Sequence, residues 1–141
     1  MKDIKAGYQV HTTTWENDGD HYKTIVTSGL SKEDAIFIVA LANKFNRRSK
    51  LANDYVKDTD LIEAVNDVFE LNQGLSSEML NIWKRPIEEM EDATYYVREL
   101  INEHILGIPD EYHDGGFCRL VENIDVYYIP SDIKNVTKEF I

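Results

Sequence analysis

Histidine and carboxylate side chains have the widest chemical range in this chain, and their spacing limits what they can do. The histidines are His11, His21, His104 and His113. No two of them have the H-E-x-x-H or H-x-x-x-H spacing that places two imidazoles on one helix face. The best local set of metal ligands is Asp110, Glu111, His113 and Asp114. Such a loop could hold a divalent cation for a small metal-dependent hydrolase, and an acidic surface loop before a strand explains the same residues.

Other catalytic and phosphate-binding signatures do not occur in the sequence. It contains no G-x-x-x-x-G-K-[ST], G-x-G-x-x-G or G-x-S-x-G motif. The segment Asn17 to Asp20 resembles part of a calcium loop but lacks the first ligand and the closing glutamate, so a turn explains it better. Cys118 has no neighbouring base and is expected on a strand, which argues against a thiol nucleophile. We therefore expect binding rather than catalysis, without a cofactor.

Carboxylates recur at helical spacing in the middle of the chain. Glu63, Asp67 and Glu70 fall on one face of an expected helix. Further carboxylates follow on the long helix that is expected later in the chain, at Glu88, Glu91, Asp92, Glu99 and Glu103. Negative charge repeated at every turn suits a protein that occupies a basic surface in place of phosphates. The alternative is a solvated helix face that only keeps the protein soluble.

A compact basic segment interrupts this negative chain. It consists of Lys44, Arg47, Arg48 and Lys50. Arginine side chains bind phosphate oxygens in pairs, and an aromatic ring can stack on a base. A nucleotide-binding site would therefore use Arg47, Arg48 and Tyr55, together with Arg119. The alternative is a set of cations that complements the C-terminal end of a helix.

Composition indicates a single acidic domain. The chain has 141 residues, 26 acidic against 15 basic, and a formal net charge of −11. This charge disfavours direct binding to nucleic acids or anionic membranes and favours basic partners, although solubility alone also explains it. No apolar run reaches the ~18 residues of a membrane helix, and the start of the chain lacks a signal-peptide core. With one cysteine, we expect a cytoplasmic protein.

The first elements that must position these residues are two strands. Residues 7–27 are rich in Thr, Tyr, Val and Ile around an Asp18-Gly19 turn, which predicts a β-hairpin. One face of the hairpin is expected to carry Tyr8, Val10, Thr12 and Thr14 opposite Tyr22, Thr24 and Val26.

Helices are expected in the centre of the chain. Ser31 is the predicted N-cap of a helix whose residues 35–42 are all apolar, so this helix should lie in the core. A second helix is expected after residues 58–60 and should stop at Gly74 in a left-handed conformation. Ser76 or Ser77 should begin a short helix, and Pro86 should begin a long amphipathic helix that Gly107 ends.

Two more strands are expected near the end of the chain. Residues 117–121 alternate in polarity and residues 124–129 are rich in strand-forming side chains. The predicted fold class is therefore α+β, one domain over residues 1–141, with an antiparallel sheet and three to four helices mainly on one face. The order of the strands stays open.

Two segments resemble the N-terminal part of small uncharacterised accessory proteins of large tailed bacteriophages. They are Thr12-Thr13-Thr14-Trp15-Glu16-Asn17-Asp18-Gly19-Asp20-His21-Tyr22-Lys23-Thr24 and Gly29-Leu30-Ser31-Lys32-Glu33-Asp34-Ala35. The resemblance covers the first third of the chain and transfers no functional residue. It implies a protein of the host cytoplasm that antagonises bacterial immunity, either by occluding a protein or by sequestering a nucleotide signal.

Two functions are consistent with these observations. The first is stoichiometric inhibition of a host defence or regulatory component, through the acidic faces on a basic protein or through capture of a nucleotide. The second is the metal-dependent hydrolase that uses the loop from Asp110 to Asp114. Self-association of the chain is left open.

Overall fold

The fold is α+β, as the sequence predicts. The computed structural model describes residues 5–16, 21–53, 58–71, 74–88, 93–107, 119–131 and 135–139. Its strands are β1 (Gly7–Glu16), β2 (His21–Leu30), β3 (Arg119–Ile129) and β4 (Thr137–Glu139). The helices are α1 (Lys32–Lys44), α2 (Lys50–Asn53), α3 (Asp58–Leu71), α4 (Ser77–Glu88) and α5 (Ala93–Ile101), followed by a π-helix, η1 (Asn102–Leu106).

The sheet is antiparallel with the strand order β2-β1-β3-β4. The C-terminal strand β3 thus joins the N-terminal hairpin through β1, which becomes a central strand. Thr12 lies opposite Thr24, and Thr14 lies opposite Tyr22, as expected. Register shifts in the upper half of the hairpin place Thr27 rather than Val26 opposite Val10, so the expected row is wrong at that position. The Asp18-Gly19 turn lies outside the described residues.

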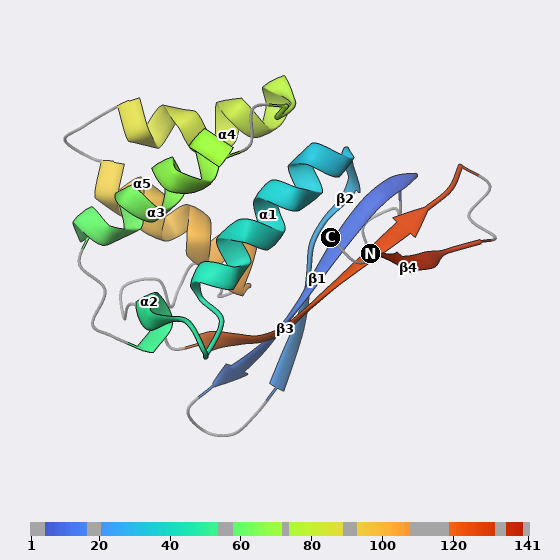
Figure 1. Cartoon of the computed structure of the whole chain (residues 1–141), viewed down its shortest axis with the longest axis horizontal. Coiled ribbons are helices and arrows are strands. Elements are labelled where there is room, and N and C mark those ends of the chain that lie inside the picture. The colour runs from blue at the N-terminus through green and yellow to red at the C-terminus, as the bar shows by residue number, and fades with distance from the viewer. Residues whose placement is uncertain are drawn as a thin grey trace.

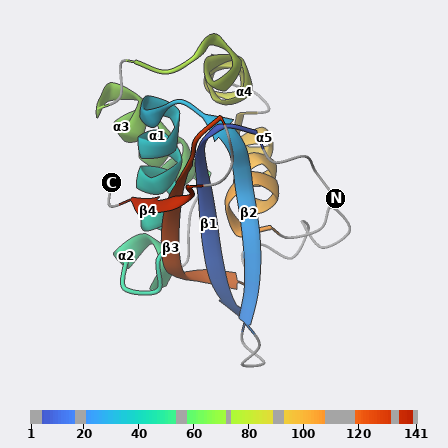
Figure 2. The ribbon, with the colours of Figure 1, turned by 90° about the vertical axis from the view of Figure 1, so that its right-hand side faces the viewer.

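The helices are packed against one face of the sheet. They lie on one side of the strands in Figure 1, and the turned view in Figure 2 shows the strands in front of them. Alternate residues of the central strands point into this layer and are buried: Val10, Thr12 and Thr14 from β1, and Val121 and Val126 from β3. The other face of the sheet carries no described helix.

Helix α1 is the core helix, as its composition predicts. Ser31 caps it, with its side-chain oxygen accepting a hydrogen bond from the Asp34 amide at 3.1 Å. The helix buries residues on most of its circumference: Ala35, Phe37, Ile38, Val39, Leu41 and Ala42. Aromatic contacts then tie it to its neighbours, because the Phe37 ring lies 5.0 Å from Phe69 of α3 and 5.8 Å from Trp83 of α4.

Asp34 connects the beginnings of α1 and α4. Both carboxylate oxygens of this buried side chain accept hydrogen bonds from Ser76, one from the amide at 2.9 Å and one from the hydroxyl at 2.6 Å. The Ser76 hydroxyl oxygen in turn accepts a bond from the Met79 amide at 3.2 Å. Ser76, one of the two serines predicted to begin this helix, is therefore the cap of α4, and it is held by a charge-assisted pair that sequence spacing did not reveal.

Two details of the helical region differ from expectation. The helix expected to begin at Pro86 does not, because α4 continues through Pro86 to Glu88 and α5 begins at Ala93. Burial of Met79 and Trp83 holds α4 on the core, and the helix ends within one turn of the proline. Gly74 does not have a positive φ, so the predicted left-handed stop there is wrong. Gly107 does end its helix, with φ of 64°.

A π-helix follows α5 and creates a buried polar site. Thr12 of β1 donates a side-chain hydrogen bond to the carbonyl of Ile105 at 3.0 Å. Asn102 is 0% exposed, and within the part of the chain that the structure describes neither its amide nitrogen nor its amide oxygen has a hydrogen-bond partner. Unpaired buried polar atoms are costly, so this residue weakens the fold.

Replacing Asn102 with leucine should raise the free energy of unfolding by about 1–3 kcal/mol, because it removes unpaired polar atoms from the core. Chemical denaturation measures this change. The control is Thr12→Val, which should lower stability by about 1 kcal/mol because it removes the hydrogen bond to the Ile105 carbonyl. An Asn102→Leu variant that is less stable than the wild type would contradict the conclusion that the unpaired amide of Asn102 lowers the stability of the fold.

Candidate functional site

The carboxylates predicted to share a face of α3 do so. Glu63, Asp67 and Glu70 are all exposed, while Leu61, Ala64, Val65 and Val68 on the opposite side of the helix are buried in the core. Residues three or four apart on a helix are neighbours, so the three charges form one continuous stripe. The packing of α3 against α1 and α5 therefore presents this stripe to solvent.

An exposed leucine extends the stripe. Leu71 lies one turn after Asp67 and is 81% exposed, the highest exposure of any large apolar side chain in the described part of the chain. We call Glu63, Asp67, Glu70 and Leu71 the α3 face. An apolar side chain beside charges is typical of a protein-binding surface, in which the apolar group enters a pocket and the charges surround it.

The three carboxylates of the α3 face do not serve as ion-pair partners within the described structure. The ion pairs of the described residues use other acidic groups, namely Glu122 and Asp125. Exposed charges without an ion-pair partner contribute little to stability, so we expect reversal of these three charges to leave the fold intact.

The other predicted acidic positions are less well placed. Glu88 is in the last turn of α4, but its side chain is not among those described, and Glu91 and Asp92 lie outside the described residues. Glu99 of α5 is half-buried and Glu103 of η1 is exposed. The structure therefore supports a continuous acidic face on α3 alone.

Arg47 is positioned by a short extension of the sheet. The loop after α1 forms a parallel bridge to β3, with the Val121 amide donating to the Phe45 carbonyl at 2.8 Å and the Arg47 amide donating to the Val121 carbonyl at 2.9 Å. These bonds hold the loop against the edge of β3. A register shift in β3 places Glu122 between the partners of Thr13 and Thr14, where the extra residue of a bulge is expected.

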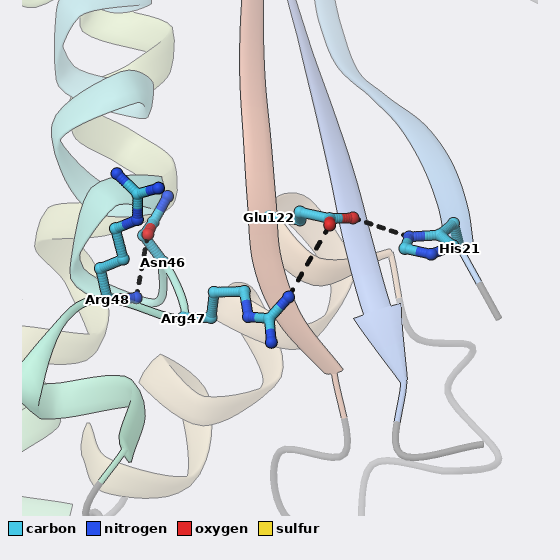
Figure 3. A network of polar contacts seen from close by, with 5 residues as sticks. All are labelled: His21, Asn46, Arg47, Arg48 and Glu122. Carbon is cyan, nitrogen blue, oxygen red and sulfur yellow. Dashed lines mark hydrogen bonds and ion pairs between the residues drawn. The ribbon is translucent and has the colours of Figure 1, made fainter. Parts of the chain in front are cut away.

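The Arg47 side chain joins residues of three strands on the helix-free side of the sheet. Its guanidinium carbon lies 5.2 Å from the centre of the Trp15 ring, and its Nη1 lies 3.8 Å from Glu122 Oε1. The other oxygen of Glu122 is 2.7 Å from His21 Nδ1, as Figure 3 shows. Sequence spacing could not find this cluster, because its members come from β1, β2, β3 and the loop after α1.

Arg48 does not join Arg47. Its backbone amide donates to Asn46 Oδ1 at 3.0 Å, and Figure 3 shows the two arginine side chains directed apart. Arg119 is the first residue of β3, but its side chain is not described, and Tyr55 lies outside the described residues. Four residues are expected to bind a nucleotide, and the structure describes the side chains of two of them. Arg47 lies against a carboxylate and an indole ring, and the Arg48 side chain points away from Arg47.

A second polar group lies farther along the helix-free face. The Nε2–H of His11 donates to Gln9 Oε1 at 2.7 Å, and its ring lies 4.9 Å from the Tyr127 ring. Desolvation by the surrounding residues lowers the pKa of His11 below 6.5, with Lys23 acting in the same direction and Asp125 opposing it. Asp125 is itself engaged by Lys138 at 2.9 Å. These surroundings favour the neutral form of His11.

Acid should destabilise the protein through His11. In the unfolded chain His11 takes up a proton as the pH falls through 6.5, whereas in the folded protein it does so only at lower pH. The contribution of neutral His11 to the free energy of unfolding is therefore fully present above pH 6.5 and is lost as the pH falls below that value. Melting temperatures from about pH 7.5 to about pH 5.5 measure the loss. His11→Phe keeps a ring beside Tyr127 and cannot titrate, so its decline with acid should be smaller. An equal decline in both proteins would refute this role.

The hydrolase prediction cannot be placed on the structure, because Asp110, Glu111, His113, Asp114 and Cys118 lie outside the described residues. Within the described ranges, no three His, Cys, Asp or Glu side chains are grouped as metal ligands would be.

The described helices include none with the length and apolarity needed to cross a membrane. Comparison of the chain with protein-family models, curated proteins and solved structures finds no match.

Proposed function

We propose that this protein works by binding a basic surface of another protein through its α3 face and blocking that surface. The observation that carries the proposal is the row of exposed Glu63, Asp67 and Glu70 beside Leu71, which is 81% exposed. The packing of α3 against α1 and α5 supports it, because a helix that is already formed loses little conformational freedom on binding. The mode is a helix face laid against a complementary groove.

The two kinds of side chain on the α3 face have different roles. The carboxylates attract lysine and arginine side chains over a distance, so they raise the rate of encounter. Leu71 lies at the C-terminal end of α3 and gives the contact an apolar anchor that water-exposed charges cannot provide. Together they select a surface that is basic around an apolar pocket.

The class of target follows from the sequence resemblance to bacteriophage accessory proteins. Within the proposal, the partner is a component of bacterial defence or regulation, and inhibition is stoichiometric. A basic partner surface is typical of proteins that bind nucleic acids, since they neutralise phosphates with lysine and arginine. An acidic helix that occupies such a surface would exclude the nucleic acid.

Capture of a nucleotide signal is the less favoured mechanism. Glu122 lies 3.8 Å from Arg47 and would repel a phosphate group placed between them. The guanidinium is also occupied by Trp15, and Arg48 does not converge on it. A nucleotide would therefore have to displace contacts that the protein already makes.

Affinity capture from a lysate of bacterial cells tests the proposal. The α3-reversed variant carries Glu63→Lys, Asp67→Lys and Glu70→Lys. The matched control variant carries Glu33→Lys, Glu78→Lys and Glu103→Lys, three exposed carboxylates on α1, α4 and η1. Each reversal adds two positive charges, so both variants have a formal net charge of −5 in place of −11.

A partner bound through the α3 face will be retained by the wild type and by the matched control variant and lost from the α3-reversed variant. Quantitative mass spectrometry of the eluates measures this. Equal loss from both variants would show that only net charge matters, and equal retention would show that the α3 face is not the site. Either result overturns the proposal.

A further inference from the structure

Strand β2 forms one outer edge of the sheet. It is ten residues long, from His21 to Leu30, and the strand order β2-β1-β3-β4 leaves it paired on one side only. Figure 2 shows it at the border of the sheet, beside β1. No strand or bridge of the described residues pairs with its outer side. Such an edge presents a row of backbone N–H and C=O groups that can pair with another strand.

The opposite edge of the sheet is covered at two places. Strand β4 pairs with Val126, Tyr127 and Tyr128 of β3. Nearer the start of β3, the Phe45–Arg47 loop is hydrogen-bonded on both sides of Val121. Short edge strands and covering loops are the usual protection against edge-to-edge pairing. Among the described residues, one edge is therefore covered and the longer one, β2, has no strand paired with its outer side.

The residues of β2 suit pairing with an identical strand. The segment HYKTIVTSGL contains no aspartate, glutamate or proline, although the whole chain has 26 acidic residues. Proline and charged side chains are the residues that block edge pairing, and Lys23 is the single lysine or arginine of this strand. Two copies with a net charge of −11 repel each other least where neither contributes a carboxylate.

We propose that two copies of this chain associate through their β2 edges, antiparallel and about a twofold axis, to form a continuous eight-stranded sheet. A second copy supplies a strand of the same length, and a twofold arrangement is closed, so it ends at the dimer rather than growing into a fibre. The four strands of each copy make the eight. This interface is separate from the α3 face and does not depend on the proposed function.

Sedimentation equilibrium of the wild type tests the dimer directly. The monomer mass is 16.3 kDa. We expect twice this mass at high concentration, with dissociation on dilution. A monomer mass at every concentration up to ~100 µM would overturn the proposal.

Proline substitutions distinguish this edge from any other contact between copies. Successive residues of a strand direct their N–H groups to opposite edges. Proline has no N–H group, so one of the variants Thr24→Pro and Ile25→Pro loses a backbone hydrogen bond to β1. The other variant loses a backbone hydrogen bond to the second copy. The variant that keeps the wild-type circular dichroism spectrum should have the monomer mass. A folded variant of this pair that remains fully dimeric would refute the β2 interface.

Hydrogen exchange decides the case if both proline variants unfold. In the wild-type dimer, alternate amides of β2 should lose protection on dilution while the amides bonded to β1 keep it. Dilution that leaves all β2 amides unchanged while the mass falls from dimer to monomer would place the interface elsewhere.

Discussion

Replacing Ile38 with aspartate should leave the protein unfolded at neutral pH. Ile38 is 1% exposed in the middle of α1, the helix that packs on both the sheet and α3. A carboxyl group at this position either carries an unpaired charge in an apolar environment or must be neutralised with a strongly raised pKa. Each option costs several kcal/mol, against the 5–15 kcal/mol of net stability that is typical of a domain.

The control for this substitution is on the same helix. Asn43 is exposed near the end of α1, so Asn43→Asp adds the same charge without burying it. This substitution should lower the free energy of unfolding by less than about 1 kcal/mol, because a negative charge near the C-terminus of a helix interacts unfavourably with the helix dipole. Circular dichroism and the dispersion of amide resonances report folding in both variants. A native-like Ile38→Asp protein would show that α1 is not the core helix.

Reversal of the three charges on the α3 face should slow association with the captured partner by roughly tenfold to a hundredfold. Glu63, Asp67 and Glu70 are exposed and act on the partner mainly before contact, so dissociation should change less than association. The thermal stability should stay within a few degrees of the wild type, because none of the three forms an ion pair with another described residue. Surface plasmon resonance separates the two rate constants.

The matched control variant has the same net charge as the α3-reversed variant but places the lysines at Glu33, Glu78 and Glu103. Its association should be reduced much less, because electrostatic steering depends on where the charges lie relative to the contact. Two variants with the same reduced rate would indicate general attraction between an acidic and a basic protein. That result would contradict a defined site on α3.

The sequence predicted those parts of the fold that depend on local chemistry. Ser31 and Ser76 cap helices because their hydroxyl groups lie beside free amides, and residues 35–42 form a core helix because almost every position is apolar. The fold class followed from the order of these elements. On α3, the spacing of three acidic residues was sufficient to predict a shared exposed face.

Other features depend on contacts between segments far apart in the sequence. The position of β3 beside β1 and the bridge from the loop after α1 to Val121 are set by packing of the whole sheet. Spacing alone therefore offers Arg47 a phosphate or the end of a helix, whereas in the structure Trp15 and Glu122 are its neighbours. The continuation of α4 through Pro86 likewise reflects burial of Trp83, which outweighs the local preference of proline.

The dependence of the association rate on salt tests the α3 mechanism most directly. The distance over which charges act falls from ~10 Å at 0.1 M salt to ~3 Å at 1 M. For the wild type, we predict that the rate constant falls by at least about tenfold between these concentrations, and that the α3-reversed variant loses most of this dependence. A wild-type rate constant that is the same at both salt concentrations would contradict the account.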